Sequence, residues 1–406
     1  MKIVYIASII PYPPNSGHRI RNYNLLRCIG QSNELHVFIL SPDVPSPEDM
    51  NALGEFCKTI QWFQEAESEA LSQPWMAVSY LFRGMPPEYR LSYSAEMWKA
   101  LVQFFNRNQV DVIQIEDPNM AQYIEVIPRG ARVVKAITFH DVNFKKFARI
   151  AQLETKFKRK VRMKLHSLFL NRWEAQYAAK FDICLMMSEV DAQLIRSKNS
   201  ALNTVVIPNG VDTKTLRYQP KEVSPNGQIV YVGNMDYRPN IDAVTFFCCE
   251  VMPLLAQHIP DLHFFIVGIN PRDEVLNLQS EHVTVTGRVE SVEPYYRQAD
   301  VCVVPLRAGG GTRLKILESF ALGCPVVSTT IGAEGLSVVN GTHLLLADEA
   351  DSFAKAVLAV FDDPLLRDRL VKAGRQLVEE QYDWEQIAGQ LGDRYSMMVQ
   401  AATERE

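Results

Sequence analysis

The segment RAGGGTRLKILESF at residues 307–320 places three glycines directly before two cations and a carboxylate. It follows the apolar run ADVCVVPL at residues 299–306, so we expect a strand, a loop and then a helix. Glycines in such a loop let backbone N–H groups approach an anion closely, and the helix adds its positive N-terminus. The residues of this predicted anion-binding loop are Gly309, Gly310, Gly311, Thr312 and Arg313.

Lys315 and Glu318 stand three positions apart, so they share one face of the predicted helix. Lys315 can neutralise a phosphate, and Glu318, one turn deeper, has two acceptor oxygens suited to a vicinal diol such as a ribose. The pattern therefore indicates binding of a nucleoside diphosphate. By spacing alone, an intrahelical Lys–Glu pair behind a flexible loop explains it equally well.

The elements that would position this segment follow a repeated order of apolar strand, loop and helix. The strand candidates of the first half are residues 2–8, 34–40, 111–116, 131–140 and 182–188. Those of the second half are residues 228–233, 262–268, 282–287, 299–306 and 324–329. Near-continuous apolar strands that alternate with helices predict parallel sheets covered on both faces.

The segment at residues 205–228 interrupts this order with Pro, Asn and Gly, and we interpret it as a linker. The sequence therefore predicts one α/β domain at 1–205 and a second at 206–380, with sheet edges that face each other across a cleft. From about residue 350 the chain is expected to be helical. Its last part, residues 381–406, is expected to form a helix that packs back on the first domain.

The composition is that of a water-soluble globular protein, because 47% of the 406 residues are hydrophobic and 22% are charged. The net charge of −5 argues against nucleic acid as a partner. Seven cysteines without a Cys-x-x-Cys pattern favour buried thiols in a reducing compartment. The start MKIVYIASII runs directly into PYPP, which indicates a first strand rather than a signal peptide. We therefore expect a cytoplasmic protein.

The stretch VVPLRAGGGTRLKILESFALGCPVVSTTIGAEGL resembles the donor-binding signature of the retaining family 4 glycosyltransferases, which have the GT-B fold. Further matches follow in the family's order, namely PYPPNSGHRIRNYNLL, TFHDVNF, MSEVDAQLI, VIPNGVDTKTL and YVGNMDYRPNIDAV. The resemblance implies two Rossmann-like parallel-sheet domains and transfer of a sugar, with retention, from a UDP- or GDP-linked donor. A narrower resemblance to sugar transferases of bacterial exopolysaccharide synthesis implies a carbohydrate or lipid-linked acceptor.

The resemblance also implies roles for residues outside the loop. His140 is implied to face the donor sugar and to stabilise an oxocarbenium-like transition state through its side chain or backbone carbonyl. Lys315 and Glu318 complete the implied catalytic set. From the residues alone, a strand-end histidine paired with Asp141 is the simpler interpretation.

Other positions are implied to contact donor or acceptor. The implied donor-binding residues outside the loop are Gly17, Gly233, Arg238, Arg288 and Val289. The implied acceptor-side residues are His18, Arg19 and Arg21. An ordinary polar loop and helix start remains the alternative for residues 17–21.

Two positions depart from the family's pattern. Gly310 stands where members commonly carry the first Glu of a Glu-x7-Glu pair, and Asn234 stands where many have an arginine. Two alternatives therefore stay open: a nucleotide-sugar 2-epimerase of the same fold, and a non-catalytic donor-binding protein of a polysaccharide assembly. The single glycine of the first loop, Gly17, argues against a dinucleotide enzyme. Because no Asp-x-Asp occurs, we expect neither a metal nor another cofactor.

A basic amphipathic segment lies at residues 153–180. Its cations are Lys156, Lys158, Arg159, Lys160, Arg162 and Lys164. Its apolar residues recur at four-residue spacing and are Leu153, Phe157, Val161 and Leu165. Such a helix can lie on an anionic membrane, which would place the protein peripherally at the inner face. A surface helix docked on the first domain is the equally weighted alternative.

Overall fold

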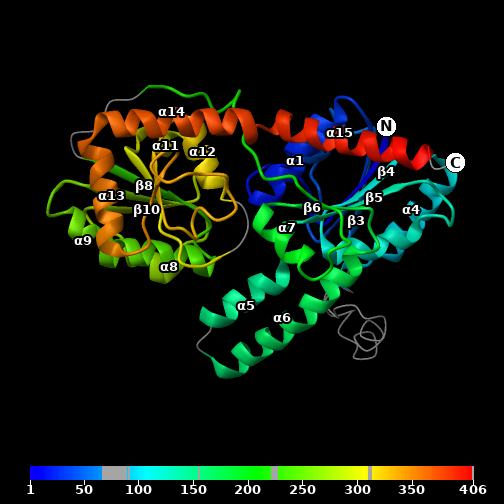
Figure 1. Cartoon of the computed structure of the whole chain (residues 1–406), viewed down its shortest axis with the longest axis horizontal. Helices are drawn as coiled ribbons and strands as arrows, with labels where there is room; N and C mark the ends of the chain where they lie inside the picture. Colours follow the sequence, from blue (N-terminus) through cyan, green and yellow to red (C-terminus); the bar gives the residue numbers. More distant parts are fainter. Residues whose placement is uncertain (66–88, 90–91, 154–155, 221–226, 310–312, 405–406) are drawn as a thin grey trace. The chain divides into compact units, whose positions relative to one another are not determined.

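The computed structural model describes residues 1–65, 89, 92–153, 156–220, 227–309 and 313–404. This part of the chain forms two compact units (Figure 1). The first unit consists of Met1–Asn209 with Trp384–Glu406, and the second of Gly210–Asp383. The sequence-based boundaries at 205/206 and 380/381 lie a few residues before these positions.

The first unit is built on a seven-stranded parallel sheet with the order β3-β2-β1-β4-β5-β6-β7. Its strands are β1 (Lys2–Ala7), β2 (Glu34–Ser41), β3 (Thr59–Gln64), β4 (Val112–Ile115), β5 (Val134–Phe139), β6 (Ile183–Met186) and β7 (Thr204–Val206). The edge strands β3 and β7 have no counterpart among the predicted strands. TIQWFQ lacks a continuous apolar run, and TVV is only three residues long.

Helices bury apolar side chains against both faces of this sheet. One face is covered by α1 (Gly17–Gly30), α2 (Pro47–Gly54) and α15 (Trp384–Thr403). The other is covered by α4 (Ala95–Arg107), the 3-10 helix η2 (Pro118–Val126), α6 (Phe157–Ala178) and α7 (Glu189–Arg196). The last helix, α15, packs against α1, and the hydroxyl of its Tyr395 donates a hydrogen bond of 2.8 Å to Gln114 of β4.

The second unit is built on a six-stranded parallel sheet with the order β10-β9-β8-β11-β12-β13. Its strands are β8 (Gln228–Val232), β9 (His263–Val267), β10 (Val283–Gly287), β11 (Val301–Val304), β12 (Val326–Ser328) and β13 (Leu345–Leu346). Only the two-residue strand β13 has no predicted counterpart. The two parallel sheets agree with the predicted α/β class.

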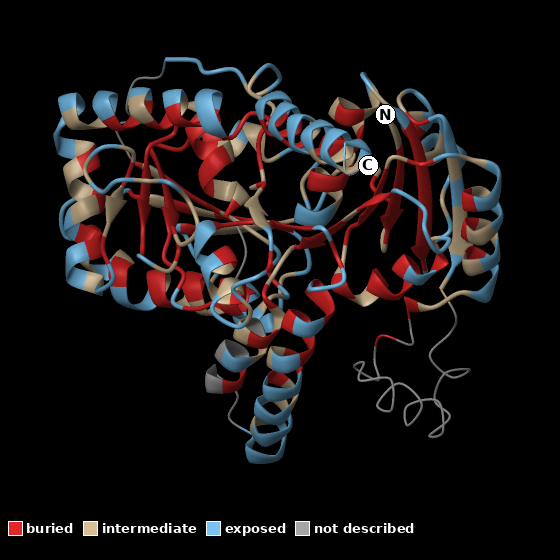
Figure 2. Cartoon of the chain, turned by 45° about the vertical axis from the view of Figure 1, so that its right-hand side comes forward, coloured by how far each residue is buried: buried red, intermediate tan, exposed pale blue. Residues whose placement is uncertain are grey.

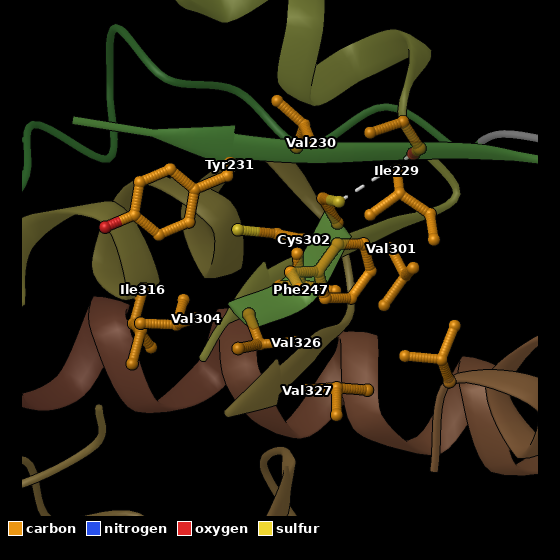
Figure 3. Close-up of a cluster of buried hydrophobic side chains, with 14 of the residues drawn as sticks. Ile229, Val230, Tyr231, Phe247, Val301, Cys302, Val304, Ile316, Val326 and Val327 are labelled. Carbon is orange, nitrogen blue, oxygen red and sulfur yellow. Dashed lines mark hydrogen bonds between the residues drawn. The ribbon is translucent and has the colours of Figure 1, made fainter. Parts of the chain in front are cut away.

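Helices of the second unit enclose one apolar core (Figure 3). They are α8 (Arg238–Phe246), the π-helix η3 (Phe247–Val251), α9 (Met252–Leu255), α10 (Asp273–Leu276), α11 (Glu293–Gln298), α12 (Leu314–Leu322), α13 (Ala350–Asp362) and α14 (Pro364–Gln381). In Figure 3 the ring of Tyr231 lies beside Cys302, near Ile316 of α12. The core therefore includes residues of α12, the helix that carries Lys315.

The basic segment is not the single helix expected at 153–180. It consists of the end of α5 (Asn143–Leu153) and of α6 (Phe157–Ala178), which pack along each other as a hairpin (Figure 1). The four-residue apolar spacing continues from Leu153 to Phe157 across the break, which explains why the sequence suggests one helix. No helix in the described chain combines the length and hydrophobicity needed to span a membrane.

Candidate functional site

The second unit brings a lysine, an asparagine and a tyrosine together at the start of α12. Nζ of Lys315 lies 3.8 Å from the centre of the Tyr231 ring and donates a hydrogen bond of 3.4 Å to Oδ1 of Asn240. The Tyr231 hydroxyl donates to the same oxygen at 2.6 Å. Gly233 directly follows β8, and a Cβ on this glycine would lie 3.1 Å from Nζ of Lys315. The predicted residues Gly233 and Lys315 are therefore neighbours.

Among the described residues no carboxylate forms an ion pair with Lys315, and the charge of Glu318 acts on it from one turn away. Burial lowers the pKa of its ammonium group to about 7, and the nearby charge of Arg313 acts in the same direction. An ammonium ion that is poorly hydrated and lacks a carboxylate gains most from a bound anion. Lys315 and Glu318 form no ion pair among the described residues, although the charge of each acts on the pKa of the other.

Glu318 is held by a buried tyrosine instead. The hydroxyl of Tyr296 lies 3.3 Å from Oε2 of Glu318 and 3.2 Å from the backbone oxygen of Lys315, and it can donate to either. Burial raises the pKa of Glu318, although the Tyr296 hydrogen bond and the Lys315 charge oppose that shift. Within the described chain, Oε1 of Glu318 accepts no hydrogen bond, so this oxygen is available to a ligand hydroxyl.

The predicted anion-binding loop is described only at its two ends. Gly309 has a φ of +122°, a conformation that favours glycine. A Cβ at this position would lie 3.2 Å from Nη2 of Arg313, so the buried Arg313 side chain packs directly against the glycine. Gly310, Gly311 and Thr312 lie outside the described residues.

The remaining donor-side candidates lie at the carboxyl edge of the same sheet. Arg238 is the first residue of α8, is exposed, and pairs with Glu274 at 2.5 Å. Arg288 and Val289 follow β10, where Arg288 is exposed and Val289 packs partly against the core. The contacts of these three residues with a donor stay predictions.

In the first unit, His140 and Glu116 form a pair. They directly follow β5 and β4, which are neighbouring parallel strands, so their side chains start from the same edge of the sheet. Nε2 of His140 lies 2.9 Å from Oε2 of Glu116. The carboxylate that meets His140 thus comes from the adjacent strand, and not from Asp141 as the simpler sequence interpretation has it.

Glu116 is the centre of a buried polar network. Its Oε1 accepts hydrogen bonds from Nε2 of Gln114 at 2.5 Å and from Oγ1 of Thr138 at 2.9 Å. Burial alone would raise the pKa of Glu116, but hydrogen bonding and the charges of His140 and Arg21 outweigh it and lower that pKa to about 2. This carboxylate is held by Gln114 and Thr138 and lies 2.9 Å from Nε2 of His140, close enough to orient the imidazole ring.

Among the acceptor-side candidates, His18 lies next to His140, with ring centres 4.2 Å apart. Arg19 instead forms an ion pair of 3.0 Å with Asp43. His18 follows Gly17, the exposed first residue of α1. The first unit thus places a helix N-terminus and two histidine rings together.

Arg21 is fully buried, unlike a residue that contacts an acceptor from solvent. Its Nη1 donates a hydrogen bond of 2.8 Å to the carbonyl of Pro208 and one of 3.3 Å to Oδ1 of Asn209. Its charge also stabilises the Glu116 carboxylate. The structure therefore connects Arg21 to the His140–Glu116 pair from inside the unit. Its contact with an acceptor stays a prediction.

Sequence reasoning missed Glu116, Asn240 and Tyr296. Glu116 could have been found, because it ends the predicted strand 111–116 at the edge where His140 ends the next predicted strand. Asn240 and Tyr296 follow no motif, and only the packing of α8 and α11 against α12 brings them to Lys315 and Glu318.

Two family profiles match the chain. Residues 17–215 match the profile described as "Glycosyltransferase Family 4", and residues 226–363 match "Glycosyl transferases group 1". The first match falls almost entirely in the first unit and the second entirely in the second unit. Together they cover most of the chain.

Curated relatives include mycobacterial and corynebacterial mannosyltransferases. The phosphatidyl-myo-inositol mannosyltransferase of Mycobacterium leprae is 22% identical over 312 residues, which is 74% of this chain and 77% of the relative. The enzyme of that name from Mycobacterium tuberculosis is 27% identical over 47% of this chain and 53% of its own. A GDP-mannose-dependent monoacylated α-(1-6)-phosphatidylinositol monomannoside mannosyltransferase of Corynebacterium glutamicum is 27% identical over 37% of this chain and 42% of its own. The match thus spans about half the length of the latter two relatives.

Solved structures share the fold across nearly the full chain. Sucrose-phosphate synthase from Thermosynechococcus elongatus superposes with a TM-score of 0.69 at 19% identity, covering 99% of this chain and 100% of that one. Anabaena Alr3699/HepE, solved in complex with UDP, superposes with a TM-score of 0.64 at 16% identity, covering 98% and 100%. These likenesses identify the architecture as GT-B.

Proposed function

Because this chain belongs to the family 4, group 1 glycosyltransferases, we propose that it transfers a sugar from a nucleoside diphosphate to an acceptor hydroxyl with retention of configuration. The observation that carries the proposal is the place of Lys315 at the start of α12, where its ammonium group contacts Asn240 and the Tyr231 ring and forms no ion pair among the described residues. Glu318 lies one turn further along the same helix. Together they suit a diphosphate and a ribose.

The reaction follows from these groups. The bond between the sugar's anomeric carbon and the diphosphate oxygen breaks, and a bond to the acceptor oxygen forms. The acceptor proton passes to an oxygen of the leaving diphosphate. Lys315 stabilises the charge on the leaving group, while His140, next to Glu116, positions the sugar through its side chain and can stabilise the developing positive charge through its backbone carbonyl.

The donor and acceptor are proposed by chemical class. A UDP- or GDP-linked sugar is supported by the UDP complex of the HepE structure and by the GDP-mannose dependence in the name of the corynebacterial relative. A lipid-linked acceptor is supported by the phosphatidylinositol acceptors in the relatives' names. We propose a role in surface or extracellular polysaccharide synthesis, at the cytoplasmic face of the membrane.

A thermal-shift panel of nucleotide sugars tests this proposal, followed by turnover with the stabilising donor. A donor present at 100 times its Kd stabilises the folded state by about 2.7 kcal/mol, so the right donor stands out from the panel. Sugar transferred to a lipid extract supports the proposal. Epimerisation of the donor in the absence of acceptor would identify a 2-epimerase instead, and stabilisation without any turnover would identify a donor-binding protein.

Glu318→Ala is expected to weaken donor binding by about 1.5–3 kcal/mol, because charge-assisted hydrogen bonds to the ribose are lost. Calorimetry should show this loss for the ribonucleotide and a much smaller one for its 2′,3′-dideoxy analogue. Glu281→Ala, at an exposed position, is the matched control. Equal losses for both nucleotides would contradict the assignment of Glu318 to the ribose.

We also propose that turnover needs no metal, since Lys315 supplies positive charge where a diphosphate would bind. Transfer rates should stay within about twofold in excess chelator. In an enzyme that depends on a catalytic metal, removal of the metal would lower the rate by orders of magnitude. Loss of activity in chelator, with recovery on addition of magnesium or manganese, would overturn this prediction.

A further inference from the structure

The hairpin of α5 and α6 carries an exposed apolar stripe. Phe157, Leu165 and Leu168 are 77%, 63% and 66% exposed, and Val161 is 38% exposed. Their spacing places all four side chains on one face of α6. Contiguous exposed apolar surface of this kind marks an interaction site. Figure 2 shows this part of the hairpin largely in the colour of exposed residues.

The hairpin is nevertheless a firmly built part of the first unit. Leu170 and Trp173, further along α6, are buried in the core. At its base, the buried Glu174 carboxylate accepts hydrogen bonds from the backbone N–H groups of Asn143 and Phe144 at the start of α5. The C-terminal part of α6 packs into the core of the first unit, so the helix that carries the exposed stripe is anchored in that unit.

The hairpin is strongly basic, whereas the chain as a whole is slightly acidic. Residues 143–172 contain ten lysines and arginines against one acidic residue, Glu154, although the whole chain has a net charge of −5. Helical geometry places Lys158 and Arg162 on one side of the stripe, and Lys160 and Lys164 on the other. In the described part of the chain, these four cations form no ion pair with an acidic side chain.

We propose that the α5–α6 hairpin docks this protein on an anionic lipid surface. The stripe enters the boundary between headgroups and acyl chains, and the flanking cations contact lipid phosphates. A second copy of the chain fits less well, because a symmetric contact would bring two sets of the same cations together. The inference deepens the proposed lipid-linked acceptor, but the docking itself needs neither donor nor acceptor.

The test is co-sedimentation of the full chain with phosphatidylcholine vesicles, with and without phosphatidylglycerol, at low ionic strength. The wild type should bind only the anionic vesicles, and added salt should release it. Combined replacement of Lys158, Arg159, Lys160 and Arg162 by glutamine should weaken binding at least about tenfold. Phe157→Ser with Leu165→Ser, which leaves the charge unchanged, should weaken it as well.

A matched control removes four exposed cations outside the hairpin, with glutamine at Lys58, Lys99, Arg129 and Lys355. This control should bind vesicles like the wild type, and melting temperatures should show that every variant is folded. Equal binding by the wild type and both hairpin variants would overturn the proposal. So would a dimer in solution that Phe157→Ser with Leu165→Ser dissociates, since the stripe would then hold a second copy.

Failure of this proposal is distinguishable from failure of the proposed function. Vesicle binding is measured without substrates, and sugar transfer can be measured on a water-soluble acceptor. Hairpin variants that lose vesicle binding but keep transfer to the soluble acceptor support docking as a separate property of the hairpin.

Discussion

Lys315→Met is expected to lower kcat for sugar transfer about 10²- to 10³-fold, because the leaving diphosphate loses the charge that stabilises it. Methionine keeps a long apolar stem beside the Tyr231 ring, so the fold should be retained. Steady-state kinetics with the donor selected by the thermal-shift panel provide the measurement. Lys355→Met, at an exposed position on α13, is the control and should keep the wild-type kcat. A Lys315→Met enzyme with unchanged kcat would remove Lys315 from the mechanism.

The same lysine should make donor affinity depend on pH. Its pKa in the free protein is lowered to about 7, so below that pH the ammonium is already charged and ready for the diphosphate. Above pH 7 the amine of Lys315 is mostly neutral in the free protein. Donor binding must then be accompanied by uptake of a proton, because the bound diphosphate favours the ammonium form. The donor Kd should therefore rise with pH above 7, by up to about tenfold per pH unit. Lys315→Met should lose this dependence.

His140→Ala is expected to lower kcat about 10²- to 10³-fold and to leave the donor Kd within about threefold of the wild type. The reason is that the residues proposed to hold the nucleotide, Lys315 and Glu318, belong to the second unit, whereas His140 acts on the reacting sugar. Single-turnover rates and calorimetry measure the two effects separately. His258→Ala, at an exposed position, is the matched control.

Glu116→Gln tests whether the carboxylate orients His140. The variant keeps the shape of the side chain but loses the charge that His140 and Arg21 stabilise. We expect kcat to fall by at least about tenfold while the donor Kd is retained, a separation that general damage to the fold would not produce. Wild-type kcat in Glu116→Gln would show that the pair has only a structural role.

The sequence predicts the central strands of both sheets because they are buried on both faces and therefore carry continuous apolar runs. It does not predict β3, β7 and β13, since TIQWFQ lacks a continuous apolar run and the other two strands have only three and two residues. The same distinction applies to the site. Lys315 and Glu318 follow from their spacing on one helix, and family resemblance adds His140.

The partners of these residues depend on strand order and on packing between elements. Glu116 meets His140 only because β4 and β5 are neighbours in the sheet. Tyr296 reaches Glu318 from another helix, α11. No local pattern encodes such contacts, so sequence reasoning identifies the charged groups of the site but not the residues that orient them.

The position of α15 has a consequence for the order in which the protein folds during synthesis. Trp384, Ile387, Leu391 and Tyr395 bury one face of the first sheet, yet they are translated after the whole second unit. While the ribosome makes residues 210–383, that face of the nascent first unit lacks part of its cover and exposes apolar strands. The second unit has all its strands in one continuous segment and can complete its core first. The cover of the first sheet can therefore be completed only after α15, the last helix of the described chain, has been made.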